Sequence, residues 1–241
     1  MTKSSPVILP GSRVAALLDG RMTQLRIPVI VPPAPEADCH PRHTARHPAP
    51  YLDAYCSEPR TADNPRGMSQ RWCWWQVDDR QCLPCFDVPA VPGQYLWVKE
   101  AWRTWDRHDG LIPSRIPHDA AIFYDTDRWP YEMRKPGRQR RALDMCKRMS
   151  RLTLKVTAVQ VHRLQDITGE NALAEGAVGL CVNVDTGEAR PDGNAAIMNF
   201  AALWDRIHAG RGQGWDANPW VAALTFQTIH ANIGEIREHA A

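Results

Sequence analysis

The alternation of apolar and polar residues is clearest just after position 150. Leu152, Leu154, Val156 and Ala158 alternate with polar neighbours, which is the period-two pattern of a strand with one buried face. Pro28 lies in an otherwise β-branched run and places that strand near a sheet edge, because proline cannot donate to a neighbouring strand. Shorter apolar runs predict further strands at residues 7–9, 27–31, 95–98, 121–124 and 220–226.

Three segments carry the signals of helices. Ser12 can cap a helix that ends before Gly20, a residue suited to the left-handed position beyond a helix. Thr168 starts a second, short helix that ends at Gly176. A third begins near Asn194 and repeats apolar residues at helical spacing through Ile197, Phe200, Leu203, Trp204 and Ile207. Many strands, few helices and no regular β-α-β alternation predict an α+β protein with a barrel-like sheet.

The chain is predicted to form one domain with a long interruption. Residues 32–92 hold 11 of the 20 prolines and few periodic apolar stretches, so residues 32–91 are expected to form an irregular insertion. Residues 1–31 and 92–230 then form a single barrel domain, and residues 231–241 form a C-terminal tail.

The bulk composition is that of an ordinary globular protein. Apolar residues make up 44% of the 241 positions and charged residues 23%. No run approaches the roughly 18 apolar residues of a membrane span, and the first residues lack the apolar core of a secretory signal. These features predict a cytoplasmic location. Seven cysteines, an odd number, then favour reduced thiols or a bound metal over a disulfide framework.

The net charge of +2 hides a strongly basic segment. Between positions 128 and 151, nine basic residues face two acidic ones, a local charge of +7 that leaves −5 for the rest of the chain. Such segregation attracts polyanions, and Trp129 and Tyr131 offer stacking surfaces beside it. We interpret the segment as a nucleic-acid contact, the alternative being a solvated loop. The basic residues are Arg128, Arg134, Lys135, Arg138, Arg140, Arg141, Lys147, Arg148 and Arg151.

The predicted insertion contains cysteines that could bind a metal and tryptophans that could stack on bases. Cys82 and Cys85 form a C-x-x-C pair, and with Cys73 they are candidate ligands of a structural zinc ion. The spacing lacks a clean second pair, which favours free or buried thiols and no cofactor. Trp72, Trp74 and Trp75 can either stack on bases or anchor the insertion to the rest of the protein; the anchoring role is favoured. Lys99 and Glu100, at the end of a strand, are expected to form an exposed ion pair.

Five blocks of the sequence resemble the ASCH branch of the PUA-like superfamily, and phage- or prophage-encoded members in particular. Residues 17–26 resemble the opening "G-x-K-x-x-T-x-R" motif, and residues 92–102 are similar to "PGD-x-LWVRE-x-W". Residues 145–167, 171–176 and 200–226 resemble the "MPRWASR…RLQDI", "DA-x-AEG" and "LWD-x-I…NPWV" stretches that follow. The blocks occur in one order, which is specific to the family but not to one activity.

The resemblance implies a small β-barrel with a cleft between its first helix and the neighbouring strands. Relatives use this cleft for RNA or nucleobases, and one bacterial relative is similar to an amidohydrolase acting on N4-acetylcytidine through a Lys, a Thr and a Glu. Here those positions hold Met22, Leu25 and Glu175. Met22 and Leu25 can neither activate a nucleophile nor stabilise an oxyanion, and an arginine at 21 or 26 is a poor proton shuttle.

The first hypothesis is therefore a module that binds a nucleic acid or a modified nucleobase. Its expected contacts are Arg21, Thr23, Gln24 and Arg26 on the cleft floor, Glu175 on the wall, and Arg148 and Arg151 on phosphates.

Two other classes of function remain open. One is a hydrolase or nuclease acting on nucleic acid or a modified nucleoside, with Glu175 as its catalytic residue. The other is a phage accessory factor that binds a host or phage protein through residues 32–91.

Overall fold

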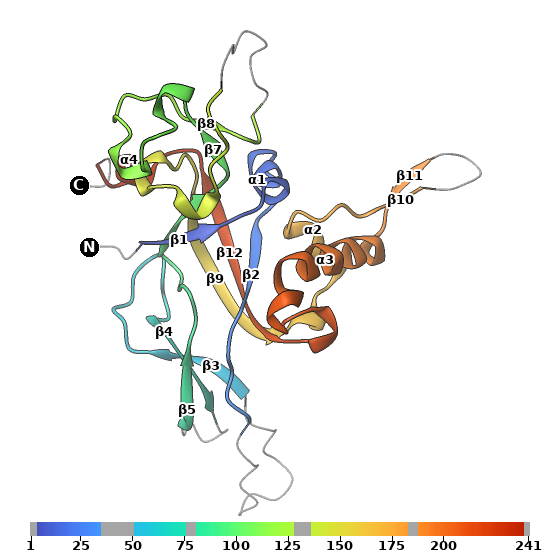
Figure 1. Cartoon of the computed structure of the whole chain (residues 1–241). Coiled ribbons are helices and arrows are strands. Elements are labelled where there is room, and N and C mark those ends of the chain that lie inside the picture. Colours follow the sequence, from blue (N-terminus) through green and yellow to red (C-terminus); the bar gives the residue numbers. More distant parts are fainter. Residues whose placement is uncertain (1–3, 35–50, 76–80, 128–135, 183–187, 239–241) are drawn as a thin grey trace, which may run out of the picture.

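The computed structural model describes residues 4–34, 51–75, 81–127, 136–182 and 188–238, except for the side chains of residues 81–84, 182, 237 and 238. Within these ranges the chain is an α+β protein with four sheets and few helices (Figure 1). The predicted fold class is confirmed at this level. None of the described helices has the length and apolar character needed to span a bilayer.

The largest sheet has five strands in the order β1-β6-β9-β12-β2. Only β1 and β6 run parallel, and the central pair β9–β12 is the longest antiparallel ladder. β1 and β2 each pair on one side only, so the expected barrel does not close among the described strands. β2 lies at an edge, as Pro28 predicts. The strands are β1 (Ser4–Ile8), β2 (Gln24–Pro28), β6 (Tyr95–Lys99), β9 (Thr153–Arg163) and β12 (Trp220–Ile229).

Helix α1 (Gly11–Leu18) connects β1 to β2, the two edges of this sheet. Val14 and Leu17 are fully buried in the main core, against apolar side chains of β6, β9 and β12. The helix begins at Gly11 after Pro10 and has no side-chain cap, so the expected cap at Ser12 is wrong. Gly20 has a φ of 70°, as expected.

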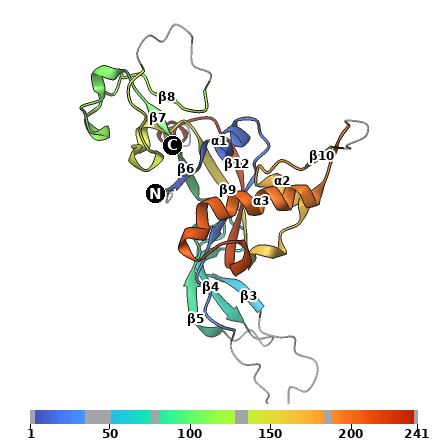
Figure 2. The same cartoon turned by 45° about the vertical axis from the view of Figure 1, so that its right-hand side comes forward.

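Helices α2 (Gly169–Ala174) and α3 (Gly193–His208) pack together on one side of the sheet (Figure 2). Thr168 caps α2 by accepting a hydrogen bond from the backbone of Asn171. A second core lies beneath these helices around Phe200 and Trp204. The hairpin of β10 (Leu180–Val182) and β11 (Ala189–Pro191) lies between them in the chain.

A lobe at the top of Figure 1 follows β6 in the chain and has its own core. Trp102, Ile116, Met145 and Met149 form that core. The expected C-terminal tail adds a short helix, α4 (Ile233–Glu238), and Asn232 donates to the backbone oxygens of two residues near Met149. The lobe contains β7 (Trp102–Arg103), β8 (Phe123–Tyr124), η1 (Asp106–His108), η2 (Pro113–Arg115), η3 (Ala142–Asp144) and η4 (Lys147–Met149). Elsewhere lie η5 (Leu164–Asp166), η6 (Ala209–Arg211) and η7 (Trp215–Ala217).

The expected irregular insertion contains a three-stranded antiparallel sheet, so that prediction is wrong over residues 51–56, 68–75 and 81–87. The sheet consists of β3 (Tyr51–Cys56), β4 (Met68–Trp75) and β5 (Gln81–Asp87), in that order. Of the described prolines in this segment, only Pro84 falls inside a strand, and β5 is an edge strand with a register shift there. Trp72 joins the main core, so this sheet shares the core of the five-stranded one.

Candidate nucleic-acid interface

A buried cluster of two arginines and one glutamate joins three elements of the fold. Arg13 comes from α1, Arg26 from β2, and Glu175 directly follows α2. Each carboxylate oxygen of Glu175 lies 3.1 Å from a guanidinium nitrogen, one of Arg13 and one of Arg26. Glu175 is completely buried and the two arginines are 4% and 2% exposed. The cluster therefore ties the first helix and an edge strand to the α2–α3 layer.

This cluster has the features of a structural ion pair. Burial raises the pKa of Glu175, and the charges of Arg13 and Arg26 oppose that shift. Burial also lowers the pKa of Arg26. Met22 and Leu25 are buried core residues and supply neither a nucleophile nor a proton donor. The carboxylate thus offsets one of the two buried positive charges, and neither of its oxygens is exposed to a substrate.

The other predicted floor residues are only partly gathered here. Gln24 accepts a hydrogen bond from Arg26 Nη1 at 3.3 Å. Thr23 is exposed, and its backbone N–H donates to the oxygen of Ala174. Arg21 is exposed and pairs with Asp19 at 2.9 Å. Gln24, Arg26 and Glu175 therefore meet, whereas Arg21 and Thr23 face solvent.

A second ion-pair cluster fixes Arg151, which was expected to contact phosphate. Arg151 Nε lies 3.0 Å from Oε1 of Glu100 and its Nη1 lies 2.6 Å from Asp127. Its guanidinium also lies 3.9 Å from the ring centroid of Tyr124, whose pKa burial raises to about 12. Glu100 is 2% exposed, so the expected exposed pair with Lys99 is wrong.

The guanidinium groups of Arg148 and Arg140 also form hydrogen bonds within the protein. Arg148 Nη2 donates to the backbone oxygens of Pro113 and Ile116, at 3.3 and 2.6 Å. Arg140 is 6% exposed, donates to the oxygen of His108 at 2.7 Å, and lies over the Trp102 ring. These arginines hold the turns of the lobe together. Their sequence positions suggest phosphate contacts, but their hydrogen bonds are internal.

A cavity of about 310 Å³ opens between η2 and η3 in the same lobe. Arg138, Arg140 and Arg141 line it with one acidic residue, Asp144. Asp144 pairs with Arg141 at 3.0 Å, and the Arg138 guanidinium has no ion-pair partner among the described residues. Burial, and after it the charge of Arg138, lowers the pKa of Arg140. The cavity wall thus carries an excess of positive charge.

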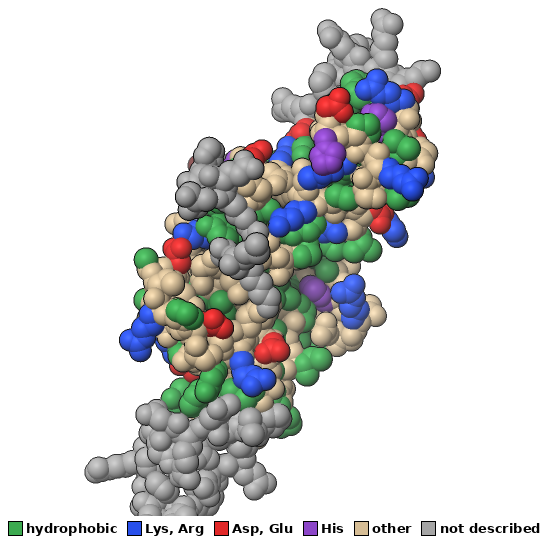
Figure 3. Space-filling model, turned by 90° about the vertical axis from the view of Figure 1, so that its left-hand side faces the viewer, with side chains coloured by type: hydrophobic (Ala, Val, Ile, Leu, Met, Phe, Trp, Pro, Cys, Tyr) green, Lys and Arg blue, Asp and Glu red, His purple; other side chains and the backbone are tan. Residues whose placement is uncertain are grey.

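Figure 3 shows Lys and Arg side chains on the upper part of the molecule, which is this lobe. The hydrogen bonds that hold Arg140, Arg148 and Arg151 inside the protein join residues 24 to 51 positions apart, so the sequence gives no local sign of them. The only sequence signal for the cavity is the run Arg138-x-Arg140-Arg141, which lies within the basic segment. The predicted residues Arg128, Trp129, Tyr131, Arg134 and Lys135 lie outside the described residues.

The cysteines of the predicted zinc site are arranged differently. Cys73 and Cys85 form a disulfide between β4 and β5, with their Cα atoms 4.5 Å apart. The preference for reduced thiols is therefore wrong for this pair, and a disulfide offers no thiolates to zinc. The side chain of Cys82 lies outside the described part, and among the described residues no group of three His, Cys, Asp or Glu side chains fits a metal.

The tryptophans of β4 divide between two roles. Trp72 and Trp74 are buried, and Trp74 Nε1 donates to the backbone oxygen of Pro32. Trp74 also contacts Trp220 of β12 edge to face. These two residues anchor the small sheet, as predicted, whereas Trp75 lies on its opposite face.

Comparison of the chain with protein-family models, with curated proteins and with solved structures finds no match.

Proposed function

We propose that this protein binds nucleic acid, and that the arginine-lined cavity of the lobe is a phosphate contact. The observation that carries the proposal is the cavity wall of Arg138, Arg140 and Arg141, where only the Arg141 guanidinium forms an ion pair with a carboxylate among the described residues. Phosphate contacts supply most of the sequence-independent affinity for nucleic acid, and arginine suits phosphate because its planar guanidinium donates in pairs.

The resemblance to ASCH-type PUA-like proteins supports the same class of ligand. That membership is part of the proposal, and the open five-stranded sheet with α1 across its two edges is compatible with it. The place of contact differs from the family's cleft. In this chain the carboxylate of Glu175 forms ion pairs with Arg13 and Arg26. We therefore place the proposed interface in the lobe and not in the cleft.

The hydrolase hypothesis receives less support from the geometry. A general base must reach the proton that it removes, within about 3 Å. Glu175 is completely buried and both of its oxygens face arginines. We therefore assign Glu175 a structural role and propose binding without turnover.

Fluorescence anisotropy with labelled single- and double-stranded RNA and DNA, repeated over a salt series, tests the proposal. The Arg138→Ala/Arg141→Ala variant is expected to bind more weakly and to show a smaller salt dependence. For a single strand the slope of log K against log salt falls by about 0.7 for each lost phosphate contact, so two contacts remove about 1.4.

Arg206→Ala is the matched control, because Arg206 is an exposed arginine on α3, outside the lobe. It is expected to leave the affinity and the salt slope unchanged. Arg148→Ala and Arg151→Ala are unsuitable probes because both residues hold the fold together. Equal losses from the lobe variant and from the control would refute a localised contact. If the wild type binds none of the strands at low salt, the proposed function is wrong.

A further inference from the structure

The outer face of the three-stranded sheet carries a row of aromatic side chains. On β3, Leu52 and Ala54 pack toward the main core, so Tyr51 and Tyr55 point the other way. Tyr51 lies directly opposite Trp75 of β4. The rings of Tyr55 and Trp75 are nearly parallel, with an interplanar angle of 12° and centroids 6.3 Å apart. The three residues therefore share one face across two strands.

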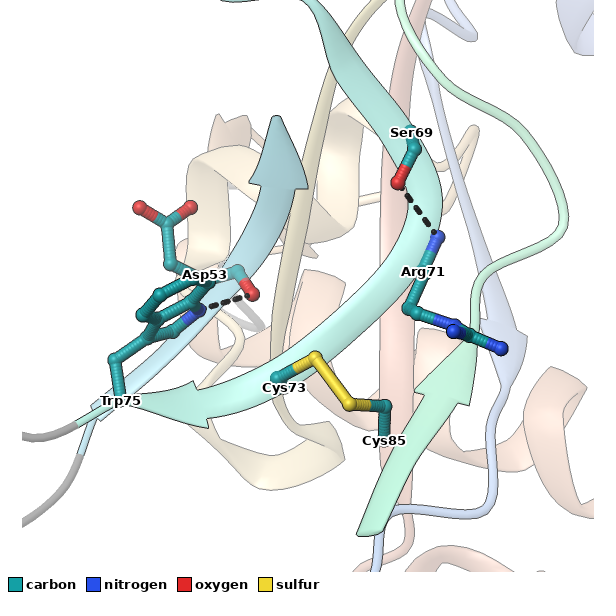
Figure 4. Close-up of a disulfide and its surroundings, with 6 residues drawn as sticks. All are labelled: Asp53, Ser69, Arg71, Cys73, Trp75 and Cys85. Carbon is teal, nitrogen blue, oxygen red and sulfur yellow. Dashed lines mark hydrogen bonds between the residues drawn. A yellow bond between two sulfur atoms is a disulfide. The ribbon is translucent and has the colours of Figure 1, made fainter. Parts of the chain in front are cut away.

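The position of the Trp75 ring on this face is fixed by a hydrogen bond to the neighbouring strand. Trp75 Nε1 donates to the backbone oxygen of Asp53 at 3.1 Å, which fixes the indole over β3. Figure 4 shows the Trp75 ring beside Asp53, with the Cys73–Cys85 disulfide and Arg71 further along β4. The disulfide joins β4 to β5 on the same side. The aromatic rings thus sit on a cross-linked surface.

The aromatic side chains remain accessible to a ligand. Tyr51 is 43% exposed and Tyr55 is 39% exposed, values at which a tyrosine ring keeps much of its surface in water. On this face Asp53 pairs with Arg66, and the exposed Arg71 side chain has no ion pair among the described residues. Asp87 lies opposite Arg71 in register and likewise has no ion pair within the described part of the chain.

We propose that Tyr51, Tyr55 and Trp75 form a stacking platform for unpaired nucleobases, with Arg71 contacting the adjoining phosphate. Flat, parallel rings on a sheet face suit bases, because every base presents a π-face whatever its sequence. The unpaired guanidinium of Arg71, on the same strand as Trp75, fits a negatively charged strand better than a neutral ligand. This inference rests on the proposed function and adds a second contact surface for the same strand, which would favour single strands over duplexes.

The experiment compares two double variants that differ only in the rings. Tyr51→Ser/Tyr55→Ser removes both rings, and Tyr51→Phe/Tyr55→Phe keeps them. Both sites are exposed, so neither variant is expected to change the melting temperature, which serves as the folding control. Anisotropy is measured with a single-stranded oligonucleotide and with an abasic oligonucleotide of the same length and charge.

Loss of the rings is expected to weaken binding of the base-containing strand by about tenfold, since one stacked base contributes roughly 1–3 kcal/mol. The abasic strand should bind both variants equally, and the Phe variant should bind like the wild type. Photo-crosslinking with 5-iodouracil in the strand should label the β3 or β4 peptide. Arg71→Gln should lower the salt slope by about 0.7, and Asp87→Asn should strengthen binding.

The two proposals fail in distinguishable ways. If the Ser variant binds like the wild type while Arg138→Ala/Arg141→Ala binds weakly, the stacking platform is refuted and the proposed function stands. Equal weakening for base-containing and abasic strands would refute stacking as well. A wild type that binds no oligonucleotide refutes both, and the exposed rings would then fit a protein or carbohydrate ligand instead.

Discussion

Replacing Glu175 with Gln is the sharpest test of how the fold is held together. The substitution keeps the shape of the side chain but removes the one negative charge between two buried arginines. Two charges 3.1 Å apart attract by about 5 kcal/mol at an effective dielectric constant of about 20. Much of this is offset by desolvation, and breaking a buried pair typically costs about 3–5 kcal/mol. We expect Glu175→Gln to lower the free energy of unfolding by that amount.

The comparison with Arg13→Met makes the prediction specific. Arg13→Met removes one arginine and leaves Arg26 paired with Glu175 at 3.1 Å, so the remaining buried pair is neutral. It should therefore cost no more than about 2 kcal/mol. Glu175→Gln leaves two buried cations without an anion and must cost more. The larger loss of stability expected for Glu175→Gln than for Arg13→Met follows from the buried charges alone and not from the number of contacts removed.

Urea denaturation followed by tryptophan fluorescence and by circular dichroism measures both variants. For a protein of this size, 1 kcal/mol shifts the melting temperature by about 2–4 °C, so Glu175→Gln should melt about 6–20 °C lower. A loss below about 1 kcal/mol, or a larger loss for Arg13→Met than for Glu175→Gln, would refute the structural role. A stabilised but inactive variant would instead indicate a catalytic carboxylate under strain.

Three further predictions concern the packing around this cluster and in the lobe. Arg151→Met leaves the buried Glu100 without its cation and should cost about 3–5 kcal/mol in urea denaturation, whereas Arg206→Met should have no effect. Gly176→Ala should lower the melting temperature more than Gly20→Ala; both have positive φ, but only at Gly176 would the new Cβ meet another side chain, 2.7 Å from Ala16 Cβ. Burial, and after it the charges of Arg13 and Arg211, lowers the pKa of His208 to about 4. Since the unfolded value is near 6.5, the unfolded state binds more protons between pH 6.5 and 4, and stability should fall as pH drops through this range. The loss is about 1–2 kcal/mol after allowance for solvent screening, and His208→Gln should remove it from a pH series of melting curves.

The elements that could be predicted from the sequence are those whose signal is local. The strand after residue 150 follows from its alternation, and it forms half of the central β9–β12 pair. The cap at Thr168 and the left-handed Gly20 follow from the chemistry of single positions. The three-stranded sheet was missed because the many prolines of this segment indicated irregular structure. In addition, the residues around Trp72–Trp75 show no regular alternation of apolar and polar side chains.

The two ion-pair clusters could not be predicted because their partners are far apart in the chain. Arg26 and Glu175 are separated by 149 positions, and Arg151 and Glu100 by 51. Arg13 lies on a helix face that is otherwise apolar, and nothing local distinguishes it from a solvent-facing residue. The disulfide was missed for a different reason, since cysteine count and expected location both favoured thiols.

The basic segment shows why charge counted along a sequence differs from charge presented on a surface. Of its nine basic residues, six are described: Arg138, Arg140, Arg141, Lys147, Arg148 and Arg151. Arg140 and Arg148 donate to backbone oxygens inside the lobe, and Arg151 neutralises two carboxylates. Such internal cations order the turns around the cavity, and ordering the turns is what places Arg138 and Arg141 on its wall. Removing an internal arginine should therefore weaken nucleic-acid binding only as far as the lobe unfolds, whereas removing a wall arginine should weaken it in a fully folded protein.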